Sequence, residues 1–471
     1  MKKYLLLSLV FLIKTSVLFA QTDNYDIEID GIFYTYDTDN NTATVVRSPY
    51  DSPYTGDITI PATISQGRFT FEVTTLGRQA FSYTDVTSVK FIVDGNKGIK
   101  YIEEGAFMGS GLVKIELPST LQSLGKKAFV KCEKLTDIKL PEGIETIPFD
   151  CFSSCKALQS ITLPESVKII EEGAFSHSGL TSITFPKNFA GMNSEAFGDC
   201  YNLASVKFND DCAFIGLCAF IYCTSLTSVE LPKNLWGLES GAFEACPIKT
   251  ITIPASTTYF KFDAFEDCDQ LKEIIFEDSD VELNVEGSVL EDSHIEKVYY
   301  GRTHSDPDEF YSSSLSSLTI GPKVTDLPYV FSDNLKEIYS YITDPSDVTE
   351  HFSKAAKGSA TLYVPKGTMD LYINAPGWKN FFFIEEFEQI KIGSAKQVPY
   401  CSEYNLDFTD KPELKAYVAT GYDKDKGTIF MTRVKQVPAE TGFLLVGEEG
   451  TYEIPVSESA SDVYYLNSAT L

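Results

Sequence analysis

Ten cysteines are the side chains of this sequence with the most obvious chemistry, because thiols form disulfides and bind zinc. No Cys-x-x-Cys pair occurs, which argues against a redox motif or a zinc cluster. Instead, one position three residues after a phenylalanine is shared by Cys132, Cys155, Cys200, Cys223, Cys246 and Cys268. A small, easily buried residue suits a recurring position of this kind, so we expect structural free thiols. Disulfides between neighbouring copies remain an open alternative.

Histidine and carboxylate chemistry gives no clearer signal. The chain has four histidines, His177, His294, His304 and His351, and none has a partner at metal-ligand spacing. The HExxH, GxSxG and P-loop patterns are absent. Carboxylates are so numerous that finding a pair of them carries no information. We therefore expect no catalytic residue, no metal ligand and no cofactor site, and we interpret the protein as not an enzyme.

The charge of the chain limits its partners. It carries 39 Lys and Arg against 67 Asp and Glu, a formal net charge of −28 at pH 7. Affinity for nucleic acid depends on Lys and Arg contacts to phosphate, so we expect no nucleic-acid partner. An anionic membrane surface would repel the chain as well. Basic partners, or neutral partners contacted through aromatic side chains, fit this composition better.

A fixed repeat positions these residues. A phenylalanine, usually preceded by alanine, recurs along the chain, and from Phe107 its spacing is 22 or 23 residues. The pairs are Ala80-Phe81, Ala106-Phe107, Ala128-Phe129, Cys151-Phe152, Ala174-Phe175, Ala196-Phe197, Ala219-Phe220, Ala242-Phe243 and Ala264-Phe265. Each unit also carries Leu-x-x-Ile-x-Leu-Pro, as in Leu158, Ile161, Leu163 and Pro164. The alternation indicates a short strand with one inward face, which proline ends. A period of this length indicates a solenoid.

The repeat and its flanks divide the chain into segments. Lys2 and Lys3 precede an apolar run at 4–19, which predicts a secretory signal peptide that is too short and too interrupted to be a membrane anchor. We expect no direct membrane insertion after its removal. The predicted segments are a signal peptide at 1–20, an N-terminal β cap at 21–75, a solenoid at 76–345, a C-terminal capping repeat at 346–390 and a C-terminal β module at 391–471.

The unit Leu-x-x-Ile-x-Leu-Pro-x-x-(Val/Ile)-x-x-Ile-x-x-x-Ala-Phe-x-x-Cys resembles the BspA-like class of leucine-rich repeats over about residues 58–387. The segments 363–368 and 374–378 look like the usual close of such arrays in Bacteroides-type bacteria, and 437–445 is similar to a β module that often follows. The resemblance implies a mainly β leucine-rich-repeat solenoid of 22–23-residue coils with β caps. It also implies export to the cell surface and no catalytic residues. Whether the last module is complete at Leu471 stays open.

In such a fold a binding surface is a better candidate for the functional site than a catalytic centre. The residues beside the strand Ile point outward and form columns across the coils, rich in Ser and Thr in the middle of the array. Towards its late end the columns turn apolar and aromatic at Ile275, Tyr299 and Tyr339. Exposed tyrosines are favoured at interfaces, although packing of Tyr299 and Tyr339 under the late loops is an equal alternative. Trp236 occupies a mostly polar position, where it is either a ligand anchor or a cover for a neighbouring side chain.

The signal peptide and the solenoid predict an exported, non-catalytic protein. The resemblance implies that it is a cell-surface adhesin, which would recognise an extracellular or host protein or a glycan through the solenoid face. The predicted ligand-binding residues are Trp236, Ile275, Tyr299 and Tyr339. The predicted location is the cell surface, the outer membrane or the secreted fraction. The alternative is a structural or spacer protein of the cell envelope without a specific ligand. The ligand, the mode of surface retention and the oligomeric state do not follow from the sequence.

Overall fold

The computed structural model describes residues 25–49, 53–286, 294–303, 309–311, 313–332, 334–423 and 428–457. The predicted signal peptide at 1–20 and the last residues of the predicted module, 458–471, lie outside this range. The chain divides into two compact units: unit 1 is Met1–Ile144 with Cys151–Ala157, and unit 2 is Glu145–Asp150 with Leu158–Leu471. Both units consist of stacked parallel coils with short strands, as the repeat predicts.

Unit 1 begins with a small antiparallel layer. The strands β1 (Ile27–Ile29), β2 (Ile32–Asp37) and β3 (Thr42–Val45) pair in order, and β5 (Thr63–Gln66) pairs antiparallel with β6 (Phe69–Leu76). β3 and β6 are parallel, which joins this layer to the first coils. The coils of unit 1 form two strips of parallel strands. One strip contains β4 (Thr55–Ile60), β7 (Asp85–Phe91), β9 (Lys114–Glu116) and β11 (Asp137–Lys139). The other strip begins with β6 and continues with β8 (Tyr101–Ile102) and β10 (Ser123–Leu124).

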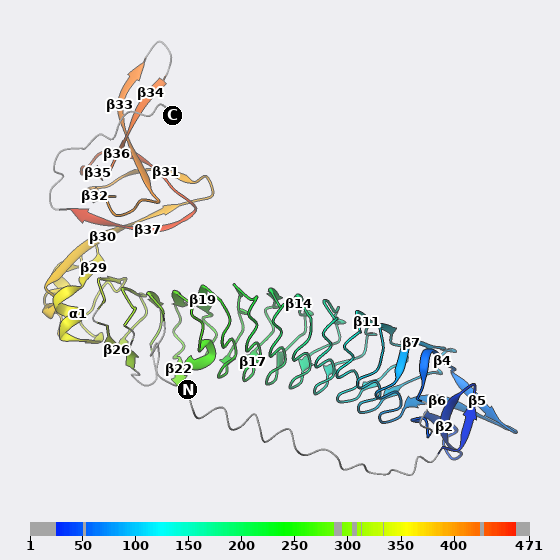
Figure 1. The fold of residues 1–471 in the computed structure, drawn as a ribbon. Helices are drawn as coiled ribbons and strands as arrows, with labels where there is room; N and C mark the ends of the chain where they lie inside the picture. Colours follow the sequence, from blue (N-terminus) through cyan, green and yellow to red (C-terminus); the bar gives the residue numbers. More distant parts are fainter. Residues whose placement is uncertain are drawn as a thin grey trace. The chain divides into compact units, whose positions relative to one another are not determined.

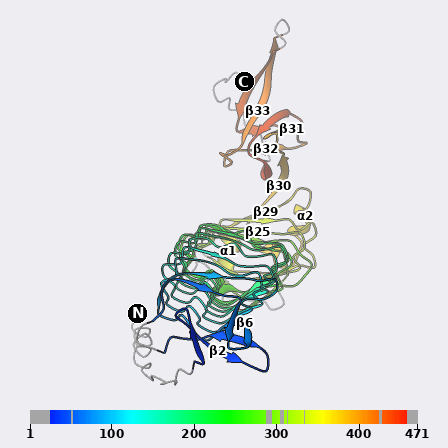
Figure 2. The same cartoon turned by 90° about the vertical axis from the view of Figure 1, so that its right-hand side faces the viewer.

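Unit 2 is itself built from stacked parallel coils with short strands (Figure 1). One strip contains β12 (Thr146–Ile147), β13 (Ile169–Ile170), β15 (Gly191–Met192), β17 (Phe214–Ile215), β18 (Gly237–Leu238), β20 (Tyr259–Lys261) and β22 (Asn284–Glu286). The 3-10 turn η1 (Phe262–Phe265) follows β20, and β24 (Glu309–Tyr311), β26 (Asp326–Phe331) and β28 (Thr349–Phe352) form a separate parallel strip. In the view of Figure 2 the coils of this unit overlie one another nearly end-on.

The Leu-x-x-Ile-x-Leu segments of unit 2 form its other face. β14 (Ser182–Thr184) pairs with β16 (Ser205–Lys207), and a longer parallel run contains β19 (Thr250–Ile253), β21 (Glu273–Phe276), β23 (Lys297–Tyr300), β25 (Ser317–Ile320), β27 (Glu337–Ser340), β29 (Thr361–Pro365) and β30 (Phe383–Ile392). We call the run β19 to β30 the late sheet. The predicted inward residues are buried along it, among them Ile251, Ile274 and Leu318.

The repeat phenylalanines form a continuous aromatic stack inside each unit. In unit 1, Phe107 lies 5.3 Å from Phe81 and 5.2 Å from Phe129 between ring centroids, with interplanar angles of 12° and 8°. In unit 2, Phe220 lies 5.2 Å from Phe197 and 5.1 Å from Phe243. These rings are fully buried. Because no coil can bury its ring alone, stacking is the main source of stability in such an array.

The repeat cysteines are free buried thiols, so the prediction made from their spacing is confirmed. Each donates its S–H to the backbone carbonyl of the repeat phenylalanine one coil earlier. The Sγ atom of Cys132 is 3.0 Å from the oxygen of Phe107, and that of Cys246 is 3.2 Å from the oxygen of Phe220. Burial raises the pKa of the Cys132 thiol to about 11. These thiols therefore stay protonated and act as weak hydrogen-bond donors.

The turns around each phenylalanine adopt a backbone conformation that the sequence analysis did not identify. From Phe81 to Phe243, the second residue before and the second residue after each repeat phenylalanine have positive φ, for example Gly105 (65°) and Gly109 (64°) around Phe107. At Phe265 only the second residue after it, Asp267 (56°), does so. Most coils place larger residues there, such as Glu195 (52°) and Asp199 (57°). The glycines that some coils have at these positions could have indicated positive φ, because glycine adopts positive φ at no steric cost.

The last coils lead into the C-terminal part through one shared strand. After α1 (Lys354–Ser359), α2 (Met369–Tyr372) and the 3-10 turn η2 (Trp378–Asn380), β30 pairs in parallel with β29 and, further along, antiparallel with β37 (Gly450–Ser457). Trp378 is fully buried in this cap. β30 therefore belongs to both the predicted cap and the predicted module.

We use the term C-terminal module for residues 393–457, which pack on the second half of β30. Its remaining strands are β31 (Gln397–Cys401), β32 (Asn405–Asp407), β33 (Lys415–Asp423), β34 (Thr428–Val434), β35 (Gln436–Val437) and β36 (Gly442–Val446). Ile390 and Ile392 of β30 contribute to the module core with Leu406, Phe443 and Ile454. The module is thus built directly on a strand of the late sheet.

Candidate functional site: a groove on the late sheet

The outward residues of the late sheet stand in two straight rows. Because the strands are parallel and in register, residues at the same strand position in successive coils are neighbours. The first row contains Thr250, Glu273, Lys297, Ser317 and Glu337, and the second contains Thr252, Ile275, Tyr299, Thr319, Tyr339 and Tyr363. The columns predicted from the repeat therefore exist, and three of the four predicted ligand-binding residues lie in the second row.

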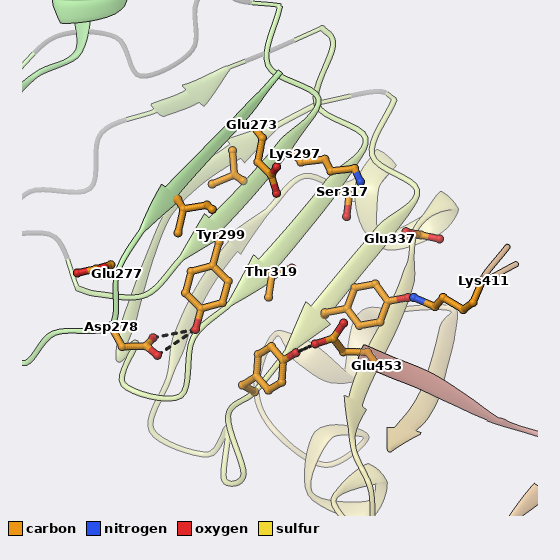
Figure 3. Close-up of a pocket in the computed structure, with 14 residues that line it drawn as sticks. Glu273, Glu277, Asp278, Lys297, Tyr299, Ser317, Thr319, Glu337, Lys411 and Glu453 are labelled. Atoms are coloured by element: carbon orange, nitrogen blue, oxygen red, sulfur yellow. Dashed lines mark hydrogen bonds between the residues drawn. The ribbon is translucent and has the colours of Figure 1, made fainter. Parts of the chain in front are cut away.

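A groove of about 690 Å³ runs over these rows where the C-terminal module approaches the sheet. Ile275, Tyr299 and Tyr339 are among its lining residues, and Asp278 stands at its rim. Lys411 and Glu453 line it from the module (Figure 3). The repeat alone supplies the floor, while the module supplies one wall.

Tyr299 forms the centre of the floor. Its hydroxyl donates to both carboxylate oxygens of Asp278, each at 3.0 Å, as Figure 3 shows. Partial burial, with the adjacent Asp278 charge, raises the pKa of the Tyr299 hydroxyl well above its usual value. The hydroxyl therefore stays protonated and fixes the Asp278 carboxylate at the groove edge.

Tyr339 contributes a packed ring to the groove. Its side chain is only 8% exposed. The ring stacks on Tyr363 with centroids 4.6 Å apart and meets Phe387 of β30 edge-on at 5.8 Å. The Nζ atom of Lys411 lies 5.4 Å from the Tyr339 ring centroid. The sequence left open whether Tyr339 is an exposed interface residue or is packed under the late loops. In the structure the ring is packed, but against Tyr363, Phe387 and Lys411 instead of the late loops.

Tyr341, Lys411 and Glu453 are lining residues that the sequence analysis did not select. The hydroxyl of Tyr341 donates to the Glu453 carboxylate, and its ring packs edge-on against Phe387 at 5.3 Å. Tyr341 lies two residues after the outward Tyr339, which is a weak indication in the sequence that it belongs to the same surface. No repeat pattern points to Lys411 or Glu453, because both lie in the non-repetitive module.

Trp236 lies elsewhere. It precedes β18, which belongs to the strip β12 to β22, and it does not line the groove. Its indole stacks on Phe214 of the preceding coil, with centroids 5.1 Å apart and planes at 24°, and its side chain is 47% exposed. Trp236 therefore covers a neighbouring ring and presents its other face outward. The structure does not bring it together with Ile275, Tyr299 and Tyr339.

The groove is acidic. Its lining has five carboxylates, Glu273, Glu277, Asp278, Glu337 and Glu453, against the two ammonium groups of Lys297 and Lys411, a formal balance of −3. The lining also contains the hydroxyls of Ser317 and Thr319, and it contains neither histidine nor cysteine. This arrangement offers charge, hydrogen bonds and aromatic contacts to a ligand.

The histidines that the structure describes are dispersed on other parts of the surface. His177 occupies the turn position two residues after Phe175 with φ 56°, and its Nε2 atom is 3.5 Å from Asp199. His294 lies 3.9 Å from Asp269, and His351 lies 3.3 Å from Asp326. Each therefore has a carboxylate neighbour of its own and none contributes to the groove. His304 lies outside the described residues.

Within the described part of the chain, no helix is both long enough and apolar enough to cross a membrane. Similar solved structures include leucine-rich-repeat proteins of bacteria. One from Bacteroides ovatus is 22% identical, covers 77% of this chain and 100% of its own, and has a TM-score of 0.44. The pneumococcal vaccine antigen PcpA is 20% identical, with coverage of 74% and 96% and a TM-score of 0.35. A leucine-rich cell surface protein from Faecalibacterium prausnitzii is 19% identical, with coverage of 76% and 94% and a TM-score of 0.34.

No curated protein matches the chain significantly. The family model described as the BspA type leucine rich repeat region matches in six copies, over residues 74–204 and 190–306. These residues contain the phenylalanine stack, the thiol position and the first strands of the late sheet. Residues 74–306 of this protein are a BspA-type leucine-rich-repeat array.

Proposed function

We propose that this protein is an exported, non-catalytic binding protein of the cell surface, an adhesin that recognises an extracellular protein or a glycan through the face of its solenoid. The observation that carries the proposal is the groove on the late sheet, where Ile275 and Tyr299 lie beside a wall supplied by the C-terminal module. A rigid array of short strands presents such a surface without needing to reorganise, which lowers the cost of binding.

The test is binding of the purified protein, without the predicted signal peptide, to an array of extracellular matrix proteins, mucins and glycans at low and physiological salt. The informative variant is Thr319→Tyr. Thr319 lies between Tyr299 and Tyr339 in the outward row, so a larger side chain there fills the groove floor. The matched control is Thr184→Tyr, at an exposed outward position of β14 outside the groove.

Saturable binding that Thr319→Tyr abolishes and Thr184→Tyr preserves would support both the adhesin function and its site. A separate Trp236→Ala variant tests the other predicted residue, because Trp236 lies outside the groove. Binding lost only in Trp236→Ala would move the site to the strip β12 to β22. Absence of saturable binding to every component would instead favour the structural or spacer role.

A further inference from the structure

We infer that the groove takes a cationic, extended peptide segment of a partner protein, with two basic side chains held by the outward carboxylates of the late sheet. The inference rests on the proposed binding function and names the ligand chemistry. It comes from the arrangement of charge in the groove, from the position of Lys411, and from the packing of the tyrosines.

The two outward glutamates in the first row are spaced for an extended chain. Glu273 on β21 and Glu337 on β27 are separated by β23 and β25, which is three strand steps. Neighbouring strands lie about 4.8 Å apart, so these two positions are about 14 Å apart. An extended peptide advances about 3.3 Å per residue and repeats its side-chain direction every second residue. Basic residues four positions apart therefore reach both glutamates from one side of the peptide.

The spread of the carboxylates favours a peptide over a metal ion. Among the residues that the structure describes, no three His, Cys, Asp or Glu side chains gather in a group that could hold a metal. Asp278 is bonded to the Tyr299 hydroxyl and Glu453 to that of Tyr341, at separate points of the lining. Negative charge distributed along a groove matches a ligand whose positive charge is also distributed.

A cation of the chain itself already occupies the aromatic end of the groove. The ammonium of Lys411 lies 5.4 Å from the centroid of the Tyr339 ring, within the range of a cation–π contact. Lys411 comes from the module, so this contact is an intramolecular example of a basic side chain placed against the groove lining. A lysine or arginine of the ligand would find similar surroundings beside Tyr299, where Asp278 adds a negative charge.

The same geometry disfavours the other ligand classes. An anionic ligand would face the formal balance of −3 in the lining and the −28 of the whole chain. A sugar ring needs a free aromatic face to stack on. Tyr339 stacks on Tyr363 and is largely buried, and the Tyr299 hydroxyl already donates its proton to Asp278, so it has none to donate to a sugar hydroxyl. A basic peptide uses the features that remain, namely the carboxylates and the hydroxyls of Ser317 and Thr319.

The probe is a fluorescein-labelled nonapeptide, Gly-Ser-Lys-Ser-Thr-Ser-Lys-Ser-Gly, with its lysines four positions apart. Binding is followed by fluorescence anisotropy against the purified protein at about 20 and 150 mM salt, since the Debye length shortens as salt rises. We expect saturable binding that weakens at least fivefold at the higher salt. The same peptide with glutamate in place of both lysines should not bind.

The test variant is the double substitution Glu273→Gln and Glu337→Gln, which removes two charges while keeping the side-chain shape. Its control is Glu116→Gln with Glu230→Gln, two exposed outward positions on other coils that give the same change in net charge. We expect at least a tenfold loss of peptide affinity in the groove variant and less than a twofold change in the control. Lys411→Ala should bind the peptide more tightly, because it removes a competing cation.

The outcomes separate this inference from the proposed function. Equal losses in the groove variant and the control would overturn the inference, because only net charge would then matter. Peptide binding that is absent, while a component of the extracellular array still binds in a groove-dependent way, would also overturn it and would leave the adhesin function standing. Groove-dependent binding of a neutral glycan would do the same. Absence of binding in both experiments would remove both proposals.

Discussion

The hydroxyl of Tyr341, directly after β27, donates a hydrogen bond to the carboxylate of Glu453 in β37, 112 residues further along the chain. The Tyr341 ring also packs against Phe387 of β30, the strand that pairs with β37. Backbone pairing and this side-chain bond therefore act together to hold the module against the late sheet. They also hold in place the wall of the groove that Glu453 forms.

Tyr341→Phe should loosen that attachment, because it removes the hydroxyl and keeps the ring. A hydrogen bond to a charged group contributes about 1.5–3 kcal/mol to stability. Because both residues are partly exposed, we expect the stabilisation lost on substitution to lie near the lower end of this range. Hydrogen exchange followed by mass spectrometry should show faster exchange in β30 and β37. Tyr400→Phe is the control, since its hydroxyl donates to Glu388 of β30 at 3.0 Å, and its loss should act on β31 and β30 but not on β37. Unchanged exchange of β37 in Tyr341→Phe would contradict the prediction.

Phe220→Ala should be among the most destabilising single changes in unit 2. The ring is fully buried between Phe197 and Phe243, so its loss opens a cavity that two flanking rings line. The expected decrease in the free energy of unfolding is about 3–5 kcal/mol, measured by urea denaturation. Tyr222→Ala, at an exposed turn position of the same coil, should change stability by less than about 1 kcal/mol. Similar losses in the two variants would refute the role assigned to the stack.

Glycine substitution should have opposite effects at two nearby alanines. Ala245 has φ 58°, so Ala245→Gly relieves left-handed strain and should raise the free energy of unfolding by up to about 1 kcal/mol. Ala242 is fully buried between coils and does not have positive φ. Ala242→Gly should therefore lower stability by about 1 kcal/mol or more, through lost packing and added chain entropy. Thermal unfolding of both variants tests the contrast, and a lower midpoint for Ala245→Gly would argue against turn strain.

The buried thiols should make stability depend on alkaline pH. Burial raises the pKa of Cys200 from about 9 to about 11, so the folded state holds its proton where the unfolded state releases it. This contribution is fully present below pH 9 and falls as pH rises from about 9 to 11. Urea denaturation at pH 8 and at pH 10.5 should show a smaller loss for Cys200→Ala than for the unmodified protein. Equal losses would show that this thiol does not titrate as expected.

Much of the architecture follows from local pattern. The Ile-x-Leu alternation places Ile274 inside and Ile275 outside without reference to the rest of the chain, because successive strand residues face opposite sides. The period then fixes the register between coils, which is why Ile275 and Tyr299 were predicted as neighbours. The thiol position was recognised for the same reason. Residues at the same position of successive coils have similar surroundings, so a position assigned as buried or exposed in one coil is assigned in all of them.

The candidate site was recovered only in part. The predicted row supplies the groove floor, but Trp236 lies on another strip, because a coil turns the chain between its two faces. The burial of Tyr339 depends on Tyr363 and Phe387, which follow in the C-terminal cap. Contacts of this kind cannot be obtained from a column of outward residues.

The sequence by itself determined the solenoid, the inward phenylalanine stack, the shared cysteine position and the outward rows of the late sheet, because each depends on contacts between residues one repeat apart. That the repeat thiols are free, and not paired in disulfides, came from the structure. Only the tertiary structure decided that a groove exists, where it lies and which charges line it. Its wall comes from Lys411 and Glu453, in a module without the repeat. The pairing of β30 with both β29 and β37 brings that wall to the sheet. Such long-range pairing has no periodic signal, since it joins two segments with different patterns.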